Sequence, residues 1–350
     1  MGIFANLRVQ RLTLLAALAL CFLGSLEIPV HADLTRACAL PITQIKPLGS
    51  LTIGGSAAQL TSVEWGAEQG CFKKYGLDIK IATTPSAQIG IAGLISGTYD
   101  LTATTPTNLL TAVSNGNFSG AIIAPRHGYT AQELTRAKQE PLYPNELLLQ
   151  TVVLVKKDST IRSWKDLTGR KIGIRSINGA DNAGVLLAMR ASGVNSAHTQ
   201  FLTMTDSQMS IALDRGDVDA AIPSDPNASQ MILGGARVIG YPYAYYAKPG
   251  SAIVYISSQE TVVKKKAAMK AFQRASLEIN SLLNKPENEG SMRTVIAAVT
   301  GVSQEAAAKD RLPTMMEKNV AYSEIAYLYK ELLFLGYIKS RIDLAPILFR

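Results

Sequence analysis

The chain has 350 residues, of which 47% are hydrophobic and 18% charged, with three cysteines and a formal net charge of +8. At about 150 residues per domain, this length suggests two domains, each able to bury an apolar core without disulfide staples. The composition excludes disordered, collagen-like and disulfide-scaffold proteins. Three histidines and three cysteines, without a C-x-x-C or H-E-x-x-H motif, leave little material for a structural metal site. We therefore expect neither a metal nor a cofactor.

The first 32 residues have the pattern of a secretory signal peptide. Arg8 and Arg11 precede an uncharged apolar run from Leu12 to Leu26, and Val30-His31-Ala32 resembles a signal-peptidase cleavage site. The run is shorter than the ~18 residues that a membrane span needs, although an uncleaved anchor is the alternative. No second apolar run of spanning length follows, so the sequence predicts a soluble, exported protein.

Charge and cysteines limit the partners and the redox state. The basic excess is spread along the chain, and its densest run, Lys264-Lys265-Lys266, is typical of a solvated helix face. A nucleic-acid-binding protein would concentrate this charge in a patch, so we expect no nucleic-acid partner. Cys38 and Cys71 remain after cleavage; export permits a disulfide between them, and two free thiols are the alternative.

The first predicted unit has the order β-α-β-α-β and spans residues 50–104. Its elements are a strand over 50–53, a helix with Leu60, Val63, Ala67 and Phe72 at helical spacing, a strand over 77–81, a helix over 89–95 and a strand over 100–104. Gly76 and Gly97 end the two helices, because glycine accepts the positive φ of a helix C-terminal turn.

The second unit repeats this plan at nearly the same length. It is predicted to have strands over 171–174 and 199–203, helices over 180–191 and 206–213, and a last strand opened by Asp219. The pattern Leu213-x-x-Gly216-x-x-Asp219 repeats Leu94-x-x-Gly97-x-x-Asp100 of the first unit. Two such units predict an α/β protein with two Rossmann-like lobes, each with a mainly parallel sheet. A single doubly wound domain with insertions is the alternative.

Two extended apolar segments lie on either side of the second unit, at 147–155 and 252–257. We interpret them as a two-strand hinge between the lobes. The remaining sequence predicts helices over 262–283, 291–298 and 323–335 that pack back onto the first lobe. The predicted organisation is a signal peptide at 1–32, a discontinuous first lobe at 33–150 and 251–350, and a second lobe at 151–250. A cleft between hinged lobes is a common place for a ligand.

The ends of the predicted strands are rich in small, hydroxyl and amide side chains. In parallel α/β sheets these ends and the following helix N-termini face the crevice, where free N–H groups hold anions. The same side chains are also common helix caps, which is the alternative interpretation. The candidate ligand-binding residues from these segments are Gly55, Ser56, Gln59, Thr104, Thr105, Arg175, Ser176, Asn178, Ser224 and Asp225.

Three further candidates lie outside these strand ends. Arg126 and His127 follow the apolar segment 120–124 and can donate hydrogen bonds to a ligand, although His127 also suits an ordinary surface loop. Tyr243 lies among the four tyrosines of 241–246, which suit either stacking on a flat ligand or packing in a strand. No G-x-S-x-G elbow is present, and the P-loop-like run that ends at Gly54 lacks its lysine. We therefore name no catalytic residue and expect no enzyme.

Four segments carry a family resemblance. Residues 70–79 (GCFKKYGLDI), 94–106, 164–173 (WKDLTGRKIG) and 213–226 resemble the periplasmic substrate-binding proteins of nitrate, sulfonate and taurine transporters. The resemblance covers about residues 50–285. It implies the two-lobed type II periplasmic binding fold, a periplasmic location, a monomeric protein and the membrane permease of an ABC importer as partner.

The resemblance implies a small organic, anionic solute of the sulfonate, taurine or nitrate type. Many relatives have Trp-Glu-Pro where this chain has Ser224-Asp225-Pro226, and the missing tryptophan leaves the ligand open. A heterocyclic vitamin precursor or an aromatic acid on the same fold is one alternative. An enzyme on a two-lobed type II fold is another, and a sensor without a transport role is a third.

Overall fold

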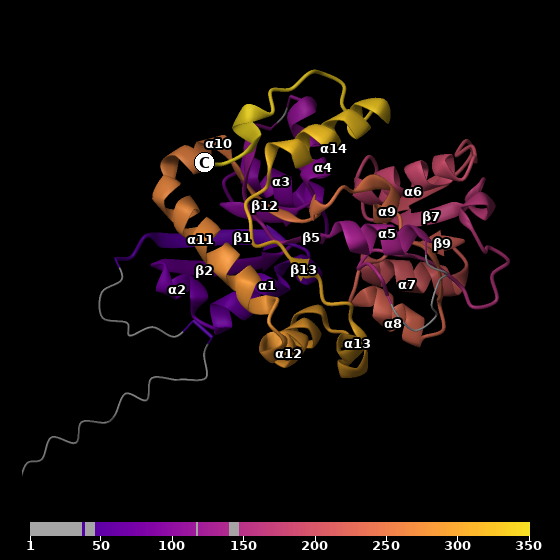
Figure 1. Ribbon diagram of the computed structural model, residues 1–350, viewed down its shortest axis with the longest axis horizontal. Coiled ribbons are helices and arrows are strands. Elements are labelled where there is room, and N and C mark those ends of the chain that lie inside the picture. Colours follow the sequence, from indigo (N-terminus) through magenta and orange to yellow (C-terminus); the bar gives the residue numbers. More distant parts are fainter. Residues whose placement is uncertain (1–36, 39–45, 117, 140–146) are drawn as a thin grey trace, which may run out of the picture. The chain divides into compact units, whose positions relative to one another are not determined.

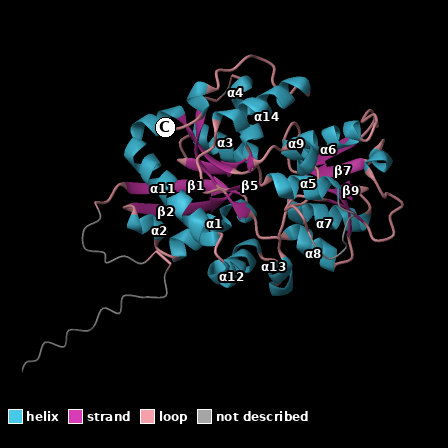
Figure 2. Cartoon of the chain, viewed as in Figure 1, coloured by secondary structure: helices cyan, strands magenta, loops and turns pink. Residues whose placement is uncertain are grey.

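Two five-stranded sheets organise the part of the chain that the computed structural model describes, which is residues 37–38, 46–116, 118–139 and 147–350 (Figure 1). The predicted signal peptide lies outside these residues. Helices cover the faces of both sheets (Figure 2). Within the described ranges, no helix combines the length and the apolar character that a bilayer crossing requires.

The first sheet has the strand order β2-β1-β3-β12-β4. Its strands are β1 (Gly49–Gly55), β2 (Leu77–Thr83), β3 (Leu101–Thr104), β4 (Gly120–Pro125) and β12 (Val254–Ser258). The strands β1, β2 and β3 are parallel, with Ile53 beside both Ile81 and Leu101, whereas β12 runs antiparallel to β3 and β4. Leu51 and Ile53 are fully buried, which explains the near-continuous apolar character of β1.

The second sheet has the order β10-β6-β9-β7-β8. Its strands are β6 (Val153–Val155), β7 (Lys171–Ile174), β8 (Gln200–Thr203), β9 (Ala220–Ala221) and β10 (Arg237–Gly240). The strand β7 is parallel to β8 and β9, and β6 is antiparallel to β9 and β10. Each sheet therefore contains one antiparallel strand, and those two strands lie in the segments predicted as the hinge.

The hinge segments differ from their prediction in one respect. Residues 147–152 are buried but do not form a regular strand. Their backbone bonds go to the loop after β9 instead of a ladder: Asp225 N donates to Gln150 O at 2.8 Å, and Val152 N donates to Pro223 O at 3.3 Å. The apolar character of residues 147–152 is therefore explained by their burial and not by pairing in a β-sheet.

The helices cover both sheets and include several that sequence patterns missed. They are α1 (Ala57–Glu68), α2 (Cys71–Lys74), α3 (Ala87–Ile95), α4 (Pro106–Ser114), α5 (Ala131–Gln139), α6 (Ala180–Ala191), α7 (Asp206–Arg215), α8 (Asn227–Leu233), α9 (Tyr243–Tyr246), α10 (Gln259–Lys264), α11 (Lys266–Leu283), α12 (Glu289–Thr300), α13 (Gln304–Lys309) and α14 (Tyr322–Phe334), with 3-10 turns at Trp164–Leu167, Pro286–Asn288 and Ala345–Ile347. The first predicted helix is two helices, because Gly70 adopts a left-handed φ of 77° between them. The predicted helix over 262–283 is likewise interrupted at Lys265.

A small antiparallel sheet of β5 (His127–Tyr129), β11 (Gly250–Ser251) and β13 (Thr314–Met315) joins distant parts of the chain. Gly128 is required where β5 meets β11, because a Cβ there would lie 1.8 Å from the carbonyl oxygen of Gly250. This sheet fixes the backbone of His127 directly after β4.

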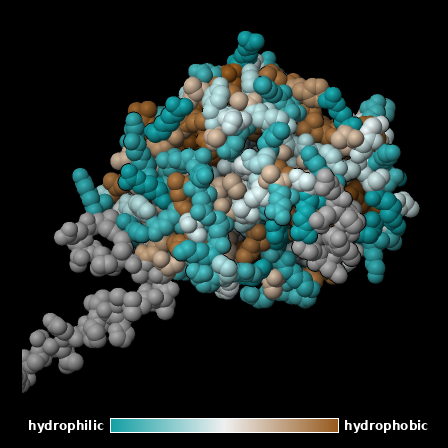
Figure 3. Space-filling view, viewed as in Figure 1, coloured by the Kyte–Doolittle hydropathy of each residue, from teal (hydrophilic) through white to brown (hydrophobic). Residues whose placement is uncertain are grey.

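The core consists of apolar clusters on both sheets. Trp65, Phe72 and Phe272 are buried beside the first sheet, and Trp164 is buried beside the second. A disulfide joins Cys38 to Cys71 with a Cα–Cα distance of 4.9 Å. Of the two possibilities left by the sequence, a disulfide and two free thiols, the structure has the disulfide. Hydrophilic residues are spread across the face shown in Figure 3.

Candidate functional site

A cavity of about 450 Å³ is lined by residues from both sheets. Six helices begin at or next to its wall, namely α1, α3, α4, α6, α7 and α8. Each follows a strand or loop at the carboxyl edge of its sheet, so the positive ends of the helix dipoles face the cavity. These helix ends place partial positive charge along the wall of the cavity.

Arg126 is the buried cation of the wall formed by the first sheet. Arg126 follows directly after β4, and the residue is 3% exposed. Nε donates to Ser62 Oγ at 3.0 Å, and Nη2 donates to Ala58 O at 3.0 Å and to Thr61 Oγ1 at 2.9 Å. Burial lowers the pKa of Arg126. Among the described residues no carboxylate forms an ion pair with it: its hydrogen-bond acceptors are neutral, and the charge of Asp310 offsets the effect of burial only in part.

His127 lies beside Arg126 and is held neutral. Burial lowers its pKa well below the usual value, and the charges of Arg126 and Arg175 add to this effect. Its Nδ1 contacts Nη1 of Arg126, so the arginine donates and Nδ1 accepts. A neutral imidazole in this arrangement carries its proton on Nε2, where it can serve as a hydrogen-bond donor.

Arg175 and Asp181 form a two-pronged ion pair on the wall of the second sheet. Nε donates to Oδ2 at 2.9 Å, and Nη2 donates to Oδ1 at 2.5 Å. Nη1 also contacts Ser224 Oγ. Burial alone would lower the pKa of Arg175, but Asp181 and Asp206 outweigh burial and raise it well above its usual value. The charge of Arg175 is thus already satisfied within the protein.

Asp206 opens α7 on the same wall and has an oxygen without a partner. Its Oδ1 is inaccessible to solvent and forms no hydrogen bond within the described structure, while the backbone N–H of Ser224 hydrogen-bonds to its carboxylate. Burial raises the pKa of Asp206 to about 6, Arg175 opposes this rise and Asp181 adds to it. An exposed carboxylate at a helix N-terminus would shift the other way.

Asp225 lines the cavity but its carboxylate is fully engaged. Oδ1 accepts from the backbone N–H of Ser229 at 2.9 Å and from its hydroxyl at 2.8 Å, and Oδ2 accepts from Arg311 N at 2.9 Å. Asp310 also hydrogen-bonds to it, and burial raises the pKa of both carboxyl groups. Asp225 therefore joins the start of α8 to the segment after α13.

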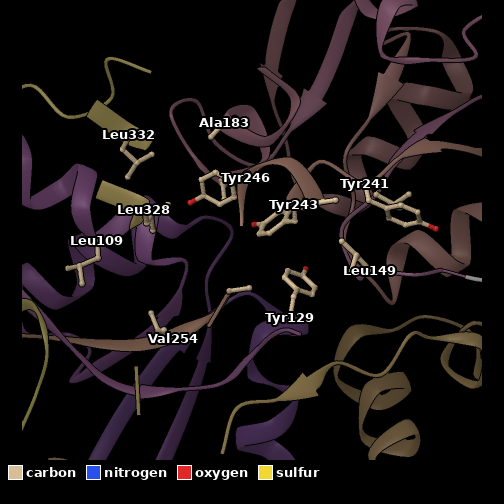
Figure 4. Packing of buried hydrophobic residues seen from close by; sticks show 14 of the residues in the cluster. Leu109, Tyr129, Leu149, Ala183, Tyr241, Tyr243, Tyr246, Val254, Leu328 and Leu332 are labelled. Carbon is tan, nitrogen blue, oxygen red and sulfur yellow. The ribbon is translucent and has the colours of Figure 1, made fainter. Parts of the chain in front are cut away.

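Tyr129 and Tyr243 give the cavity an aromatic edge. Their ring centroids lie 5.7 Å apart at 66°, and Figure 4 shows both rings between the two sheets, with Tyr246 beside Tyr243. The hydroxyl of Tyr129 hydrogen-bonds to Thr151. Tyr243 lies in the short helix α9 instead of the strand considered from the sequence, and its ring reaches the cavity.

Most of the predicted ligand-binding residues meet at this one cavity. Those on its wall are Ser56, Gln59, Thr105, Arg126, His127, Arg175, Ser176, Ser224, Asp225 and Tyr243. Gly55, Thr104 and Asn178 do not line it: Gly55 packs against Leu60 and Ala103, and Thr104 accepts from Asn108 Nδ2 at 2.9 Å. Asn178 is exposed and has a left-handed φ of 56°. Thr105 is also the N-cap of α4, so the same residue both caps a helix and lines the cavity.

Sequence reasoning missed the polar residues at the carboxyl ends of β2 and β8, the second strand of each predicted β-α-β-α-β unit. Those residues include Thr83, Thr84, Ser86, Thr205, Asp206 and Ser207. These residues could have been predicted from the topology. The strands β2 and β8 run parallel to β1 and β7, so they end at the same edge of each sheet. Tyr129, Asp181 and Thr151 carried no comparable pattern.

The comparisons agree with this architecture. Residues 146–289 match the sequence model of the NMT1/THI5-like family. No curated protein sequence matches the chain significantly.

Solved structures resemble the chain over most of its length. The periplasmic aliphatic sulphonate-binding protein SsuA of Escherichia coli is 20% identical, with 85% of this chain and 97% of that chain covered and a TM-score of 0.66. The periplasmic nitrate-binding protein NrtA of Synechocystis PCC 6803 is 14% identical, with 84% and 83% covered and a TM-score of 0.67. The desulfurization enzyme DSZB is 14% identical, with 85% and 95% covered and a TM-score of 0.58.

These likenesses confirm the predicted α/β class and the type II periplasmic binding fold. Each sheet is mainly parallel, as predicted, and is mixed because one strand, β12 or β6, runs antiparallel to its neighbours. The fold occurs in binding proteins and in an enzyme, so it does not decide between binding and catalysis.

Proposed function

We propose that this protein is the exported, periplasmic solute-binding component of an ABC importer, with residues 1–32 as its signal peptide. The two sheets belong to two lobes, 33–150 with 251–350 and 151–250, that close on a small organic solute and deliver it to a membrane permease. The NMT1/THI5-like match over 146–289 and the likeness to two periplasmic binding proteins support this proposal.

Arg126 is the observation that carries the ligand part of the proposal. A buried guanidinium without an ion pair is costly, and a charged hydrogen-bond acceptor on the ligand would relieve that cost. Arg126 follows β4 and lies near the start of α1, where the helix dipole adds to its positive field. A sulfonate, nitrate or carboxylate group of the solute binds there in our proposal.

The aromatic edge supports the alternative of a ring-bearing ligand on the same fold. Tyr129 and Tyr243 can pack against a flat heterocycle or an aromatic acid. A cavity of about 450 Å³ is also within the range of sites that hold an organic molecule of moderate size. Nitrate alone would leave most of this volume unfilled.

An enzyme is the second candidate because DSZB has the same fold. His127 is the histidine of the cavity, and histidine is the residue type that enzymes use most often for proton transfer. However, its Nδ1 is occupied by Arg126, and burial keeps its pKa far below neutrality. A general base needs a pKa near the working pH, so His127 is poorly suited to that role.

A thermal-shift screen of sulfonates, nitrate, carboxylates and heterocycles tests the proposal, because a ligand that binds only the folded state raises its apparent stability. We expect at least one solute to raise the Tm and to be recovered chemically unchanged. Conversion of that solute on incubation would favour the enzyme instead. Stabilisation by none of these classes would contradict the proposed binding function.

A further inference from the structure

The two walls of the cavity differ in charge. Among the described residues of the first wall, Arg126 is the only charged side chain, since His127 is held neutral. On the second wall Arg175 faces two carboxylates, Asp181 and Asp206, and its ion pair with Asp181 accounts for only one of them. An unpaired cation therefore lies on one side, whereas on the other side one guanidinium serves two carboxylates.

Asp206 is not needed by the helix that it opens. Thr205 is the N-cap of α7: its hydroxyl accepts from Gln208 N at 3.3 Å, and Gln208 Oε1 accepts from Thr205 N at 2.8 Å. This capping box satisfies the helix end without Asp206. The unpartnered oxygen of Asp206 is closed off from the cavity, but the residue itself lines the cavity. Rotation of the carboxylate would bring this oxygen to a donor on a ligand and relieve the cost of leaving it without a hydrogen bond.

The total charge of the cavity also argues against a plain anion. Its ionisable lining consists of Arg126, Arg175, Asp181, Asp206 and Asp225, in addition to the neutral His127 and the tyrosines. Three carboxylates outnumber two guanidinium groups, so an anion without a positive group would enter a site that already has an excess of acids. A ligand that also carries an amine would restore the balance.

We propose that the solute carries both an anionic group and a protonated amine, with Arg126 binding the anion and Asp206 binding the amine. This inference rests on the proposed binding function and narrows its ligand class to zwitterions. Contacts to opposite walls also explain how such a ligand would favour the closed state, because only contacts completed on closing stabilise it.

Two matched series of probes test this directly. One consists of 4-methylbenzoate, 4-methylbenzylamine and 4-(aminomethyl)benzoate, and the other of propanesulfonate, propylamine and 3-aminopropanesulfonate. Calorimetry on the full protein should show, in at least one series, that the doubly charged compound binds about tenfold or more tightly than either singly charged one.

Asp206→Asn identifies the residue responsible. It should remove this advantage, weakening the zwitterion about tenfold or more while leaving the plain anion unchanged or improved. Asp214→Asn on the exposed face of the same helix is the matched control and should change neither. Circular dichroism confirms that each variant is folded.

The proposal is overturned if plain anions bind at least as well as the zwitterions in both series, or if Asp206→Asn keeps the zwitterion's advantage. It is also overturned if neither zwitterion binds. A plain anion or a heterocycle that binds in these cases leaves the proposed solute-binding function intact, so the two failures are distinguishable.

Discussion

Asp225 and Asp310 share a hydrogen bond between their side chains, which links the start of α8 to the end of α13. Asp225 comes from the half of the chain that contains the second sheet, whereas Asp310 lies beyond α12, a helix packed against α1. Two carboxyl groups can share a hydrogen bond only if one of them is protonated, so this contact depends on pH.

The pair should make stability fall with rising pH. Burial and Asp225 raise the pKa of Asp310 well above its ordinary 3.8, so the folded protein holds a proton that the unfolded chain releases above about pH 4. The stabilisation is complete below that pH and declines as pH rises, by up to about 1.4 kcal/mol per unit. Urea unfolding at pH 5 and pH 8 measures this decline.

Asp310→Asn should flatten this dependence, because the amide donates to Asp225 at every pH. Asp78→Asn, on an exposed position of β2, is the control and should keep the wild-type slope. Equal slopes for wild type and Asp310→Asn would show that no proton is shared.

Arg175→Ala should destabilise the protein by about 1–3 kcal/mol, since it leaves the buried Asp181 without its partner. The value falls below that of a fully buried pair because the Arg175 side chain is 30% exposed. The double variant Arg175→Ala/Asp181→Ala should recover part of the loss in chemical denaturation. Strictly additive effects would mean that the pair contributes nothing.

The disulfide between Cys38 and Cys71 closes a separation of 33 residues. Removing both thiols by Cys38→Ser/Cys71→Ser should cost about 2–4 kcal/mol, chiefly by freeing the unfolded chain. Mass spectrometry of protein produced in the periplasm should show the loss of two hydrogens. A reductant should lower the Tm of the wild type but not of the double variant; two free thiols in the wild type would refute the bridge.

Closure around the ligand should reduce the radius of gyration. The chain passes between the two sheets through segments near β6 and β12, which suits a hinge motion on the microsecond to millisecond scale. Small-angle scattering with and without a saturating ligand from the screen measures the change. An unchanged radius, with binding confirmed by calorimetry, would count against closure.

Much of the fold was predictable because local patterns and the global fold agree. The bounds of α6 match the predicted helix, and Gly97 and Gly216 adopt the positive φ that the repeated motif requires. The short helices α8, α9 and α13 were missed, since four to seven residues are too few for a helical period to be read. Their positions are set by packing, as in the contact of α13 with α8.

The site was predictable where it follows strand ends and unpredictable where distant segments meet. Ser56 and Arg175 lie at the ends of strands, and topology brought them to one cavity. The pairing of Asp225 with Asp310 joins positions far apart in the sequence through the helix-to-strand segment near β13. The sequence marked Asp225 as a candidate ligand contact, but it could not show that Ser229 and Arg311 already use the oxygens of its carboxylate.

Calorimetric titration of Arg126→Gln with the tightest solute from the screen tests the central claim most directly. The variant keeps hydrogen-bonding capacity but removes the buried charge, and Arg215→Gln on the exposed end of α7 is the matched control. The account predicts that Arg126→Gln weakens binding about tenfold or more while Arg215→Gln binds as the wild type does. Equal affinity for all three folded proteins would contradict it.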